Sequence, residues 1–409
     1  MSIAIAILGL ALLILVHEAG HFFASLAVGL RPRKFYVGFP PAIAKTKRNG
    51  IEYGFGAIPL GGFVTIPGMH RPVPHDAERR FDAAVSEDAG LAGAVDRVKR
   101  ALVGDDLEAS LGTLDDLERE LKSRKLSATS TKLAEKGLTE LRDALGPDAY
   151  WKAATWKRLV AIAAGPGANI LLAIGLFAVL FMTGSGKATR TIAEVIPDSP
   201  AAEVGLQPGD RLVAINGDTV TASDIPDVIS GSEGAPLTLR VVRGGEEVVL
   251  GPVSARPIDD VYRLGFGLQG VGLGPIEAVG RAFEITGIIS KEIVFSLGRL
   301  VTGEGRENVA SPIGITQASS DAVERGAENY LFVLGLISLS LALLNLLPLL
   351  PLDGGHILFS LIEGARGRFL KREVYERVSV VGLGLVLLLF FVGLSNDIGR
   401  LTGEGFDVR

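Results

Sequence analysis

Three residues near the amino terminus have the types and the spacing of a hydrolytic metal site. His17, Glu18 and His21 form an HExxH pattern, and two histidines four residues apart lie on one face of a helix. Both imidazoles can then bind a single Zn2+, and Glu18 between them can act as the general base for a water molecule. Chance is a poor explanation, because the chain has only 5 histidines and two of them fall at this spacing.

The segment that carries this pattern is apolar enough to cross a membrane. Residues 3–30 exceed the roughly 20 residues that a spanning helix needs, and Ile3–Val16 holds no charge. A signal peptide is an alternative, but residues 1–4 lack the basic segment that one requires. Ionisable side chains inside a bilayer are costly and usually functional, so the sequence predicts an intramembrane metal site.

A third ligand must come from elsewhere in the chain. The chain has 0 cysteines, so zinc would be held by histidine and carboxylate. Asp353 follows two prolines and precedes two glycines at the end of an apolar segment, where a broken helix can present an acid. His356 competes with it but lies further along, and we favour Asp353.

The composition is that of a polytopic membrane protein. The 409 residues are 48% hydrophobic with a mean hydropathy of +0.37, and they leave room for two or three domains. A net charge of −5 gives no indication of nucleic-acid binding. The fold class expected is an α-helical membrane protein with four transmembrane helices, at residues 3–30, 159–183, 330–352 and 378–395. Basic residues after the first, before the second and between the third and fourth spans place those loops in the cytoplasm.

Two regions between the first and second spans differ in character. In residues 31–70, Asn49-Gly50 predicts a β-hairpin, which we expect to be membrane-associated; its exposed strand edge could accept an extended substrate. A plain cytoplasmic hairpin is the alternative. Residues 71–150 are highly charged, and leucines at helical spacing predict a cytoplasmic helical insertion, most simply a helical hairpin.

Two further regions lie between the second and third spans. Residues 190–258 contain short strand patterns, and the run SPAAEVGLQPGDRLVAINGDTV closely resembles a PDZ domain, an α+β module that binds extended peptides. It would face the extracytoplasmic side. In residues 275–329 an amphipathic segment over 276–300 predicts a helix along the membrane surface, followed by a loop at Ser311–Gly314.

Together these motifs resemble the bacterial site-2 protease family, of the regulator of sigma-E protease type. The resemblance rests on HExxH in the first span, Gly165-Pro166 and Asn169 in the second, the PDZ module, and Asn345, Pro348 and Leu352-Asp353-Gly354-Gly355 at the third. It implies that His17, His21 and Asp353 bind zinc and that Glu18 activates water. It also implies that Asn345 and Pro348 hold unwound substrate and that the Ser311–Gly314 loop controls access. The chain departs from the family in having one PDZ module and a long insertion.

The resulting prediction is a Zn2+-dependent intramembrane endopeptidase in a bacterial inner membrane. Its substrates would be single-span membrane proteins, such as an anti-sigma factor or a signal-peptide remnant, in regulated intramembrane proteolysis. Two alternatives come from other classes: a zinc transporter, and a catalytically inactive relative that binds membrane substrates. The first explains neither Glu18 nor the PDZ module, and the second would be expected to lack a ligand.

Overall fold

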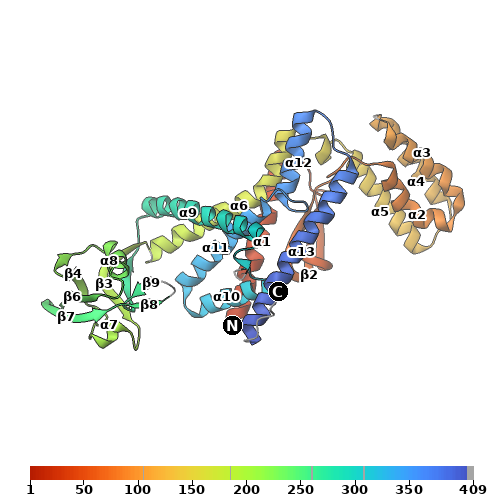
Figure 1. The fold of residues 1–409 in the computed structure, drawn as a ribbon. Helices are drawn as coiled ribbons and strands as arrows, with labels where there is room; N and C mark the ends of the chain where they lie inside the picture. Colours follow the sequence, from red (N-terminus) through yellow and green to blue (C-terminus); the bar gives the residue numbers. More distant parts are fainter. Residues whose placement is uncertain (105, 185, 259–260, 307–308, 403–409) are drawn as a thin grey trace. The chain divides into compact units, whose positions relative to one another are not determined.

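The computed structural model describes residues 1–104, 106–184, 186–258, 261–306 and 309–402 (Figure 1). The chain forms two compact units, which are considered separately. The first unit contains residues 1–173, 290–325 and the chain from 336 onward, and the second contains 174–289 and 326–335.

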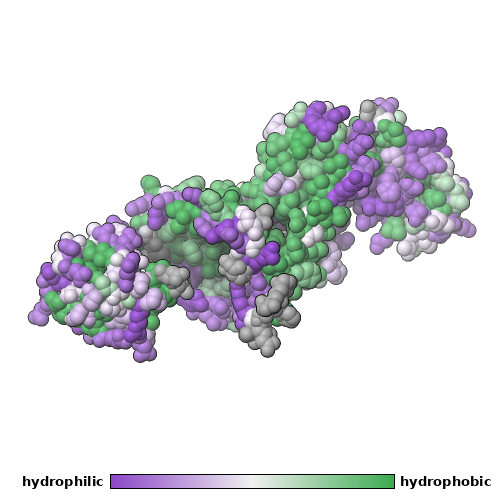
Figure 2. All heavy atoms as spheres, in the orientation of Figure 1, coloured by the Kyte–Doolittle hydropathy of each residue, from purple (hydrophilic) through white to green (hydrophobic). Residues whose placement is uncertain are grey.

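Among the described residues, four helices are long and apolar enough to cross a membrane, as the sequence predicts: α1 (Ser2–Ala27), α6 (Thr155–Thr183), α11 (Ala327–Asn345) and α13 (Arg372–Thr402). In α13 large apolar side chains point outward, including Val380 (71% exposed) and Phe391 (61% exposed). Figure 2 shows the hydrophobic surface over α13 and its neighbours in the first unit. Such a surface suits lipid rather than water.

The third span is shorter than predicted. α11 ends at Asn345, seven residues before the expected boundary, and residues 346–352 form turns. Pro348 and Pro351 have no N–H to donate, so the helix cannot continue through them. A new helix, α12 (Asp353–Arg366), begins at the predicted metal ligand. Gly367, whose φ is 62°, follows its last residue.

The predicted hairpin is part of a larger sheet formed by β1 (Lys34–Arg48) and β2 (Ile51–Thr65). The Asn49-Gly50 turn has positive φ at both residues, 51° and 82°, as the sequence predicts for a type I′ turn. Each residue of 34–37 has two partners, one in 52–55 and one in 62–65. Residues 62–65 thus lie beside 34–37, and Phe22 of α1 packs on Phe35 with ring centroids 4.9 Å apart.

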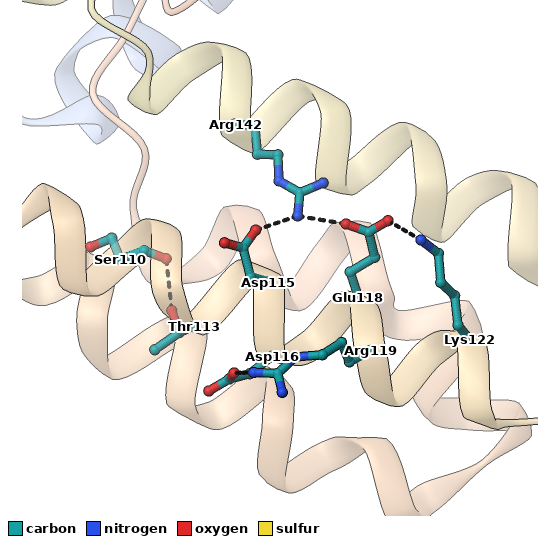
Figure 3. A network of polar contacts seen from close by, with 8 residues as sticks. All are labelled: Ser110, Thr113, Asp115, Asp116, Glu118, Arg119, Lys122 and Arg142. Atoms are coloured by element: carbon teal, nitrogen blue, oxygen red, sulfur yellow. Dashed lines mark hydrogen bonds and ion pairs between the residues drawn. The ribbon is translucent and has the colours of Figure 1, made fainter.

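The insertion is a four-helix bundle with its own core, so the expectation of a single helical hairpin is wrong. Its helices are α2 (Pro74–Glu87), α3 (Ala92–Val103), α4 (Leu107–Ser123) and α5 (Ala128–Leu145), with a 3-10 turn at Ala89–Leu91. Phe81, Leu114 and Leu141 are almost fully buried in its core. Two of the helices are joined at the surface by Arg142, which contacts Asp115 (2.5 Å) and Glu118 (2.6 Å) (Figure 3).

The chain enters and leaves the insertion at one place. The Tyr150 N–H donates to the Pro67 carbonyl (2.9 Å) and the Trp151 N–H to the Gly68 carbonyl (3.0 Å). A 3-10 turn, Tyr150–Lys152, follows and leads into α6. We call these two hydrogen bonds the neck of the insertion.

The second unit contains a six-stranded sheet. Its strands are β3 (Lys187–Val195), β4 (Arg211–Ile215), β5 (Asp218–Thr219), β6 (Pro236–Arg243), β7 (Glu246–Ser254) and β10 (Phe266–Val271), in the order β10-β3-β4-β6-β7 with β5 on β4. The helices are α7 (Pro200–Glu203), capped by Ser199, and α8 (Asp224–Ser230); β8 (Arg256–Ile258) pairs with β9 (Val261–Arg263). β10 pairs with β3, so the module extends beyond the predicted boundary at 258, because a distant strand completes the sheet.

A buried carboxylate holds the turn before β4. Asp210 is 1% exposed and accepts two hydrogen bonds from Arg243, both 2.7 Å long, and one from the Gln207 N–H (2.9 Å). These bonds, led by those from Arg243, lower the pKa of the Asp210 carboxyl. A lowered pKa means that this stabilisation is present above pH about 4 and is lost as the pH falls through the lowered value.

We predict that Asp210→Asn destabilises β4 locally by about 1.5–3 kcal/mol at neutral pH, because it removes a charged acceptor. Hydrogen exchange of the β4 amides in the full-length protein would measure the loss, which should shrink toward acid pH. Asp218→Asn, on the exposed β5, is the matched control and should leave exchange unchanged. Equal exchange in both variants would contradict the prediction.

Two helices lie between the sheet of the second unit and α11 in the sequence: α9 (Pro275–Thr302), where the sequence predicts an amphipathic helix, and α10 (Pro312–Glu324). The expected loop at Ser311–Gly314 is instead the cap and first turn of α10. Asp397 of α13 accepts hydrogen bonds from the N–H groups of Ser311 (2.8 Å) and Gly314 (3.0 Å). An acidic side chain at a helix start satisfies donors that lack partners within the helix, which explains why α10 begins there.

Candidate active site

α1 and α12 bring the three predicted ligands together. His17 and His21 lie one turn apart on α1 and are 8% and 7% exposed, with their Nε2 atoms 3.2 Å apart. Asp353, in the first turn of α12, places Oδ2 3.2 Å from the Nε2 of His17 and 3.3 Å from that of His21. His21 and Asp353 are 332 positions apart in the sequence, and yet their ligand atoms lie side by side.

The three side chains fit a zinc ion. Their ligand atoms lie within 4.8 Å of one another, and within the described part of the chain no other group of three such residues does so. Tetrahedral zinc with ligands at about 2.0–2.2 Å separates those ligands by about 3.3–3.6 Å, close to the distances found here. His356 is not part of this group, although the sequence left it as a competitor.

A backbone carbonyl orients one of the histidines. The Nδ1 of His21 lies 3.0 Å from the carbonyl oxygen of Ala161 on α6. A carbonyl only accepts, so Nδ1 carries the proton and Nε2 keeps its lone pair for a metal. No sequence pattern marks Ala161, because the group that acts is its backbone.

Glu18 faces the edge of the β1–β2 sheet. A Cβ atom on Gly62 would lie 3.1 Å from the Cγ of Glu18 and 3.9 Å from its Cβ. The predicted general base therefore lies beside residues 62–65. The Gly61-Gly62 doublet, which permits a close approach of the backbone, is the sequence signal for this contact.

Small residues let α6 approach α1 closely. A Cβ on Gly20 would lie 2.3 Å from the Ala164 carbonyl oxygen, and one on Gly165 would lie 2.2 Å from the Nε2 of His21. Asn169 joins α6 to α11 through its backbone rather than its side chain. The backbone carbonyl of Asn169 accepts from Ser338 Oγ (2.8 Å), while its buried amide side chain has no hydrogen-bond partner among the described residues.

We predict that Gly165→Ala lowers zinc affinity and peptidase activity by about 10- to 100-fold, the range typical of residues that support metal ligands. The added methyl group would collide with the ligand atom of His21, which must move. Zinc affinity by chelator competition is the measurement. Gly167→Ala in the same helix meets nothing within 4 Å and serves as the control. Wild-type affinity in Gly165→Ala would show that the site tolerates the shift.

Asn345 and Pro348, expected to hold substrate, lie between α11 and α12. Asn345 ends α11 and its Nδ2 donates to the Leu341 carbonyl (3.0 Å), while Pro348 lies in the turn before Asp353. Both are close to the ligand in sequence, and the amide oxygen of Asn345 makes no protein hydrogen bond that the described residues supply. Their role with substrate stays a prediction.

Comparison with known proteins identifies the family. The model of peptidase family M50 matches residues 5–389, which include both the HExxH helix and Asp353. The chain belongs to this family. A putative zinc metalloprotease of Agrobacterium fabrum is 32% identical over 416 residues, covering 97% of this chain and 95% of the relative.

Other relatives of this M50 peptidase include the zinc metalloprotease RasP of Bacillus licheniformis (30% identical; 95% of this chain, 96% of RasP) and the probable protease eep of Enterococcus faecalis (28%; 95% and 96%). The resemblance seen in the sequence is thereby confirmed. The protein is a site-2 type zinc metalloprotease, which confirms the predictions of enzyme class and of Zn2+ as cofactor. The transporter alternative is excluded by the same finding.

Proposed function

We propose that this M50 peptidase cleaves single-span membrane proteins within the bilayer, with His17, His21 and Asp353 as zinc ligands and Glu18 as general base. One observation carries the proposal: the three ligand atoms converge on a helix that is long and apolar enough to span a membrane. Buried ionisable side chains on and beside a membrane-spanning helix are expected of a site that cleaves peptide bonds at membrane depth.

The roles of the side chains follow from their chemistry. Zinc, when bound, polarises a carbonyl and lowers the pKa of a water molecule toward about 7. Glu18 accepts the proton of the attacking water and later delivers it to the leaving amine. The hydrogen bond to the Ala161 carbonyl keeps His21 in the tautomer that a metal requires. The close packing of Gly20 and Gly165 holds α1 and α6 in register with Asp353.

The sheet edge at residues 62–65 offers a way to present the substrate. A helical substrate hides its carbonyls in its own hydrogen bonds, so the scissile segment must unwind before attack. An extended segment that adds to a sheet edge recovers backbone hydrogen bonds lost on unwinding. The position of this edge beside Glu18 supports such a role. Asn345 and Pro348, just before Asp353, would contact the same segment.

The substrate class we propose is an anti-sigma factor or a signal-peptide remnant, and the location a bacterial inner membrane. The sheet of the second unit would be an extracytoplasmic PDZ domain that, with the amphipathic α9, admits only substrates whose outer domain has been removed. The α10 start, held by Asp397, would control entry to α1. The sequence resemblance supports these points.

The experiment is cleavage in liposomes of two versions of a single-span substrate, one with and one without its outer domain. We expect cleavage inside the span of the trimmed version only, and loss of cleavage with a zinc chelator. Cleavage in the outer domain, or equal cleavage of both versions, would contradict the proposed substrate selection. Failure to cleave either version by zinc-loaded protein would contradict the intramembrane activity.

A further inference from the structure

A buried ion pair joins α6 to α12 away from the metal ligands. Arg158 Nη1 and Glu363 Oε2 are 2.6 Å apart, and each side chain is 5% exposed. Removing two charges from water is costly, and apolar side chains of similar volume often hold helices equally well or better. Stability alone therefore does not explain why a buried ion pair, rather than apolar side chains, joins these two helices.

Both carboxylate oxygens of Glu363 accept hydrogen bonds. While Oε2 of Glu363 accepts from Arg158, Oε1 accepts from the Leu370 N–H (3.0 Å) and from the Tyr375 hydroxyl (3.2 Å). The aromatic ring of Tyr150 lies 5.9 Å from the Arg158 guanidinium. Three further groups, the Leu370 N–H, the Tyr375 hydroxyl and the Tyr150 ring, thus fix the arrangement of the pair.

Neighbouring contacts lie on the same face of α12. Ser360, Glu363 and Gly364 follow the i, i+3, i+4 spacing of one helix face. The Oγ of Ser360 is 3.1 Å from the Tyr150 hydroxyl, and a Cβ on Gly364 would lie 2.7 Å from the Oγ1 of Thr155. This face of α12 is therefore in close contact with residues 150–158.

The two helices that meet here each supply one element of the metal centre. Arg158 lies one turn before Ala161, whose carbonyl orients His21, and Glu363 lies ten residues after Asp353 on α12. That separation is about 15 Å along the helix axis. A rigid helix transmits a displacement at one end to the other, so a change in how α12 contacts α6 moves Asp353 relative to the His21 imidazole.

We propose that Arg158 and Glu363 are positioning residues of the metal centre, which fix the helix of Ala161 against the helix of Asp353. The inference rests on the proposed ligand set. Neither side chain touches the reacting atoms. They set the position of Asp353 relative to His21, the two ligands that must bind the same ion. Their loss therefore lowers zinc affinity as well as turnover.

The test is the double variant Arg158→Met/Glu363→Met in the full-length protein. Replacing both charges by apolar groups avoids leaving one buried charge unpaired, but the Leu370 N–H and the Tyr375 hydroxyl lose their acceptor, so we expect the protein to accumulate with a modestly lower thermal stability. We expect zinc affinity to fall about 10- to 100-fold in chelator competition, as found for other groups that support metal ligands. The visible spectrum of cobalt-substituted protein should change, and kcat should fall with little change in KM.

The control is Glu118→Met/Arg142→Met, which makes the same substitutions in a partly exposed Arg–Glu pair of the insertion (Figure 3). It should keep wild-type zinc affinity and cobalt spectrum. The single variant Arg158→Lys, which keeps the charge but loses the planar fork, should give intermediate zinc affinity. If the double variant fails to accumulate, Arg158→Lys alone tests the inference.

Wild-type zinc affinity and cobalt spectrum in Arg158→Met/Glu363→Met, or in Arg158→Lys if only that variant accumulates, would overturn the inference. His17→Ala separates this from failure of the ligand set. If His17→Ala loses zinc while the double variant keeps it, only the positioning role fails. If His17→Ala keeps wild-type zinc affinity, the ligand assignment fails and the inference with it.

Discussion

Glu18→Gln should abolish peptide cleavage while leaving zinc bound. Glutamine has nearly the same shape as glutamate but cannot accept the proton of the attacking water. Glu18 lies between the two histidines in sequence without belonging to the ligand group, so zinc should stay at wild-type stoichiometry. General acid–base catalysis contributes about 10²- to 10⁴-fold, and we expect a loss in kcat near the upper end of this range.

The measurement combines initial cleavage rates in liposomes with metal analysis of the same preparation. Glu118→Gln, in the insertion, makes the same chemical change away from the site and should keep full activity. Cleavage by Glu18→Gln at the wild-type rate would remove Glu18 from the mechanism. Loss of zinc along with activity would instead assign it a role in holding the metal.

Asp353→Ala should lose both zinc and activity. The remaining His17 and His21 give only two protein ligands, whereas catalytic zinc sites use three. We expect bound zinc to fall from about one ion per chain to a small fraction after dialysis against a chelator, and cleavage to fall by at least about 10³-fold. Metal analysis and cleavage rates measure the two losses independently.

His356→Ala is the informative control for that prediction, because the sequence alone left His356 as a competitor for the third ligand. It lies three residues after Asp353 on α12 but outside the group of converging ligand atoms. Zinc should therefore stay bound in this variant. The opposite pattern, with zinc lost in His356→Ala and kept in Asp353→Ala, would reverse the assignment.

The parts of the site that the sequence predicts are those with a local pattern. HExxH within an apolar segment predicts the α1 face, and Asn49-Gly50 predicts the turn of the sheet, since both depend on residues close in sequence. The prolines and glycines beside Asp353 predict its role, because they are unusual next to an acid at membrane depth. In each case the chemistry of the side chain itself carries the information.

The rest depends on contacts between distant segments. The glycine at position 62 permits a close approach, but no pattern in residues 62–65 predicts that they lie beside 34–37 and Glu18. Nothing marks the Ala161 carbonyl as the partner of His21. The leucine pattern does not predict the first two helices of the insertion, because α2 and α3 hold only one leucine between them. In α2, Ala77, Phe81 and Ala84 nevertheless have helical spacing and are buried.

The neck of the insertion has a consequence for how this chain can vary. Two backbone hydrogen bonds, Tyr150 to Pro67 and Trp151 to Gly68, bring the ends of the insertion together, and ion pairs of Arg33 with Asp143 and of Arg372 with Asp76 add further contacts to α5 and α2. Closing a loop costs little more as the loop grows, so residues inserted at such a point need not disturb the helices on either side. A shorter or different bundle could therefore keep its two ends together at the neck, but Arg33 and Arg372 would then need new partners in place of Asp143 and Asp76.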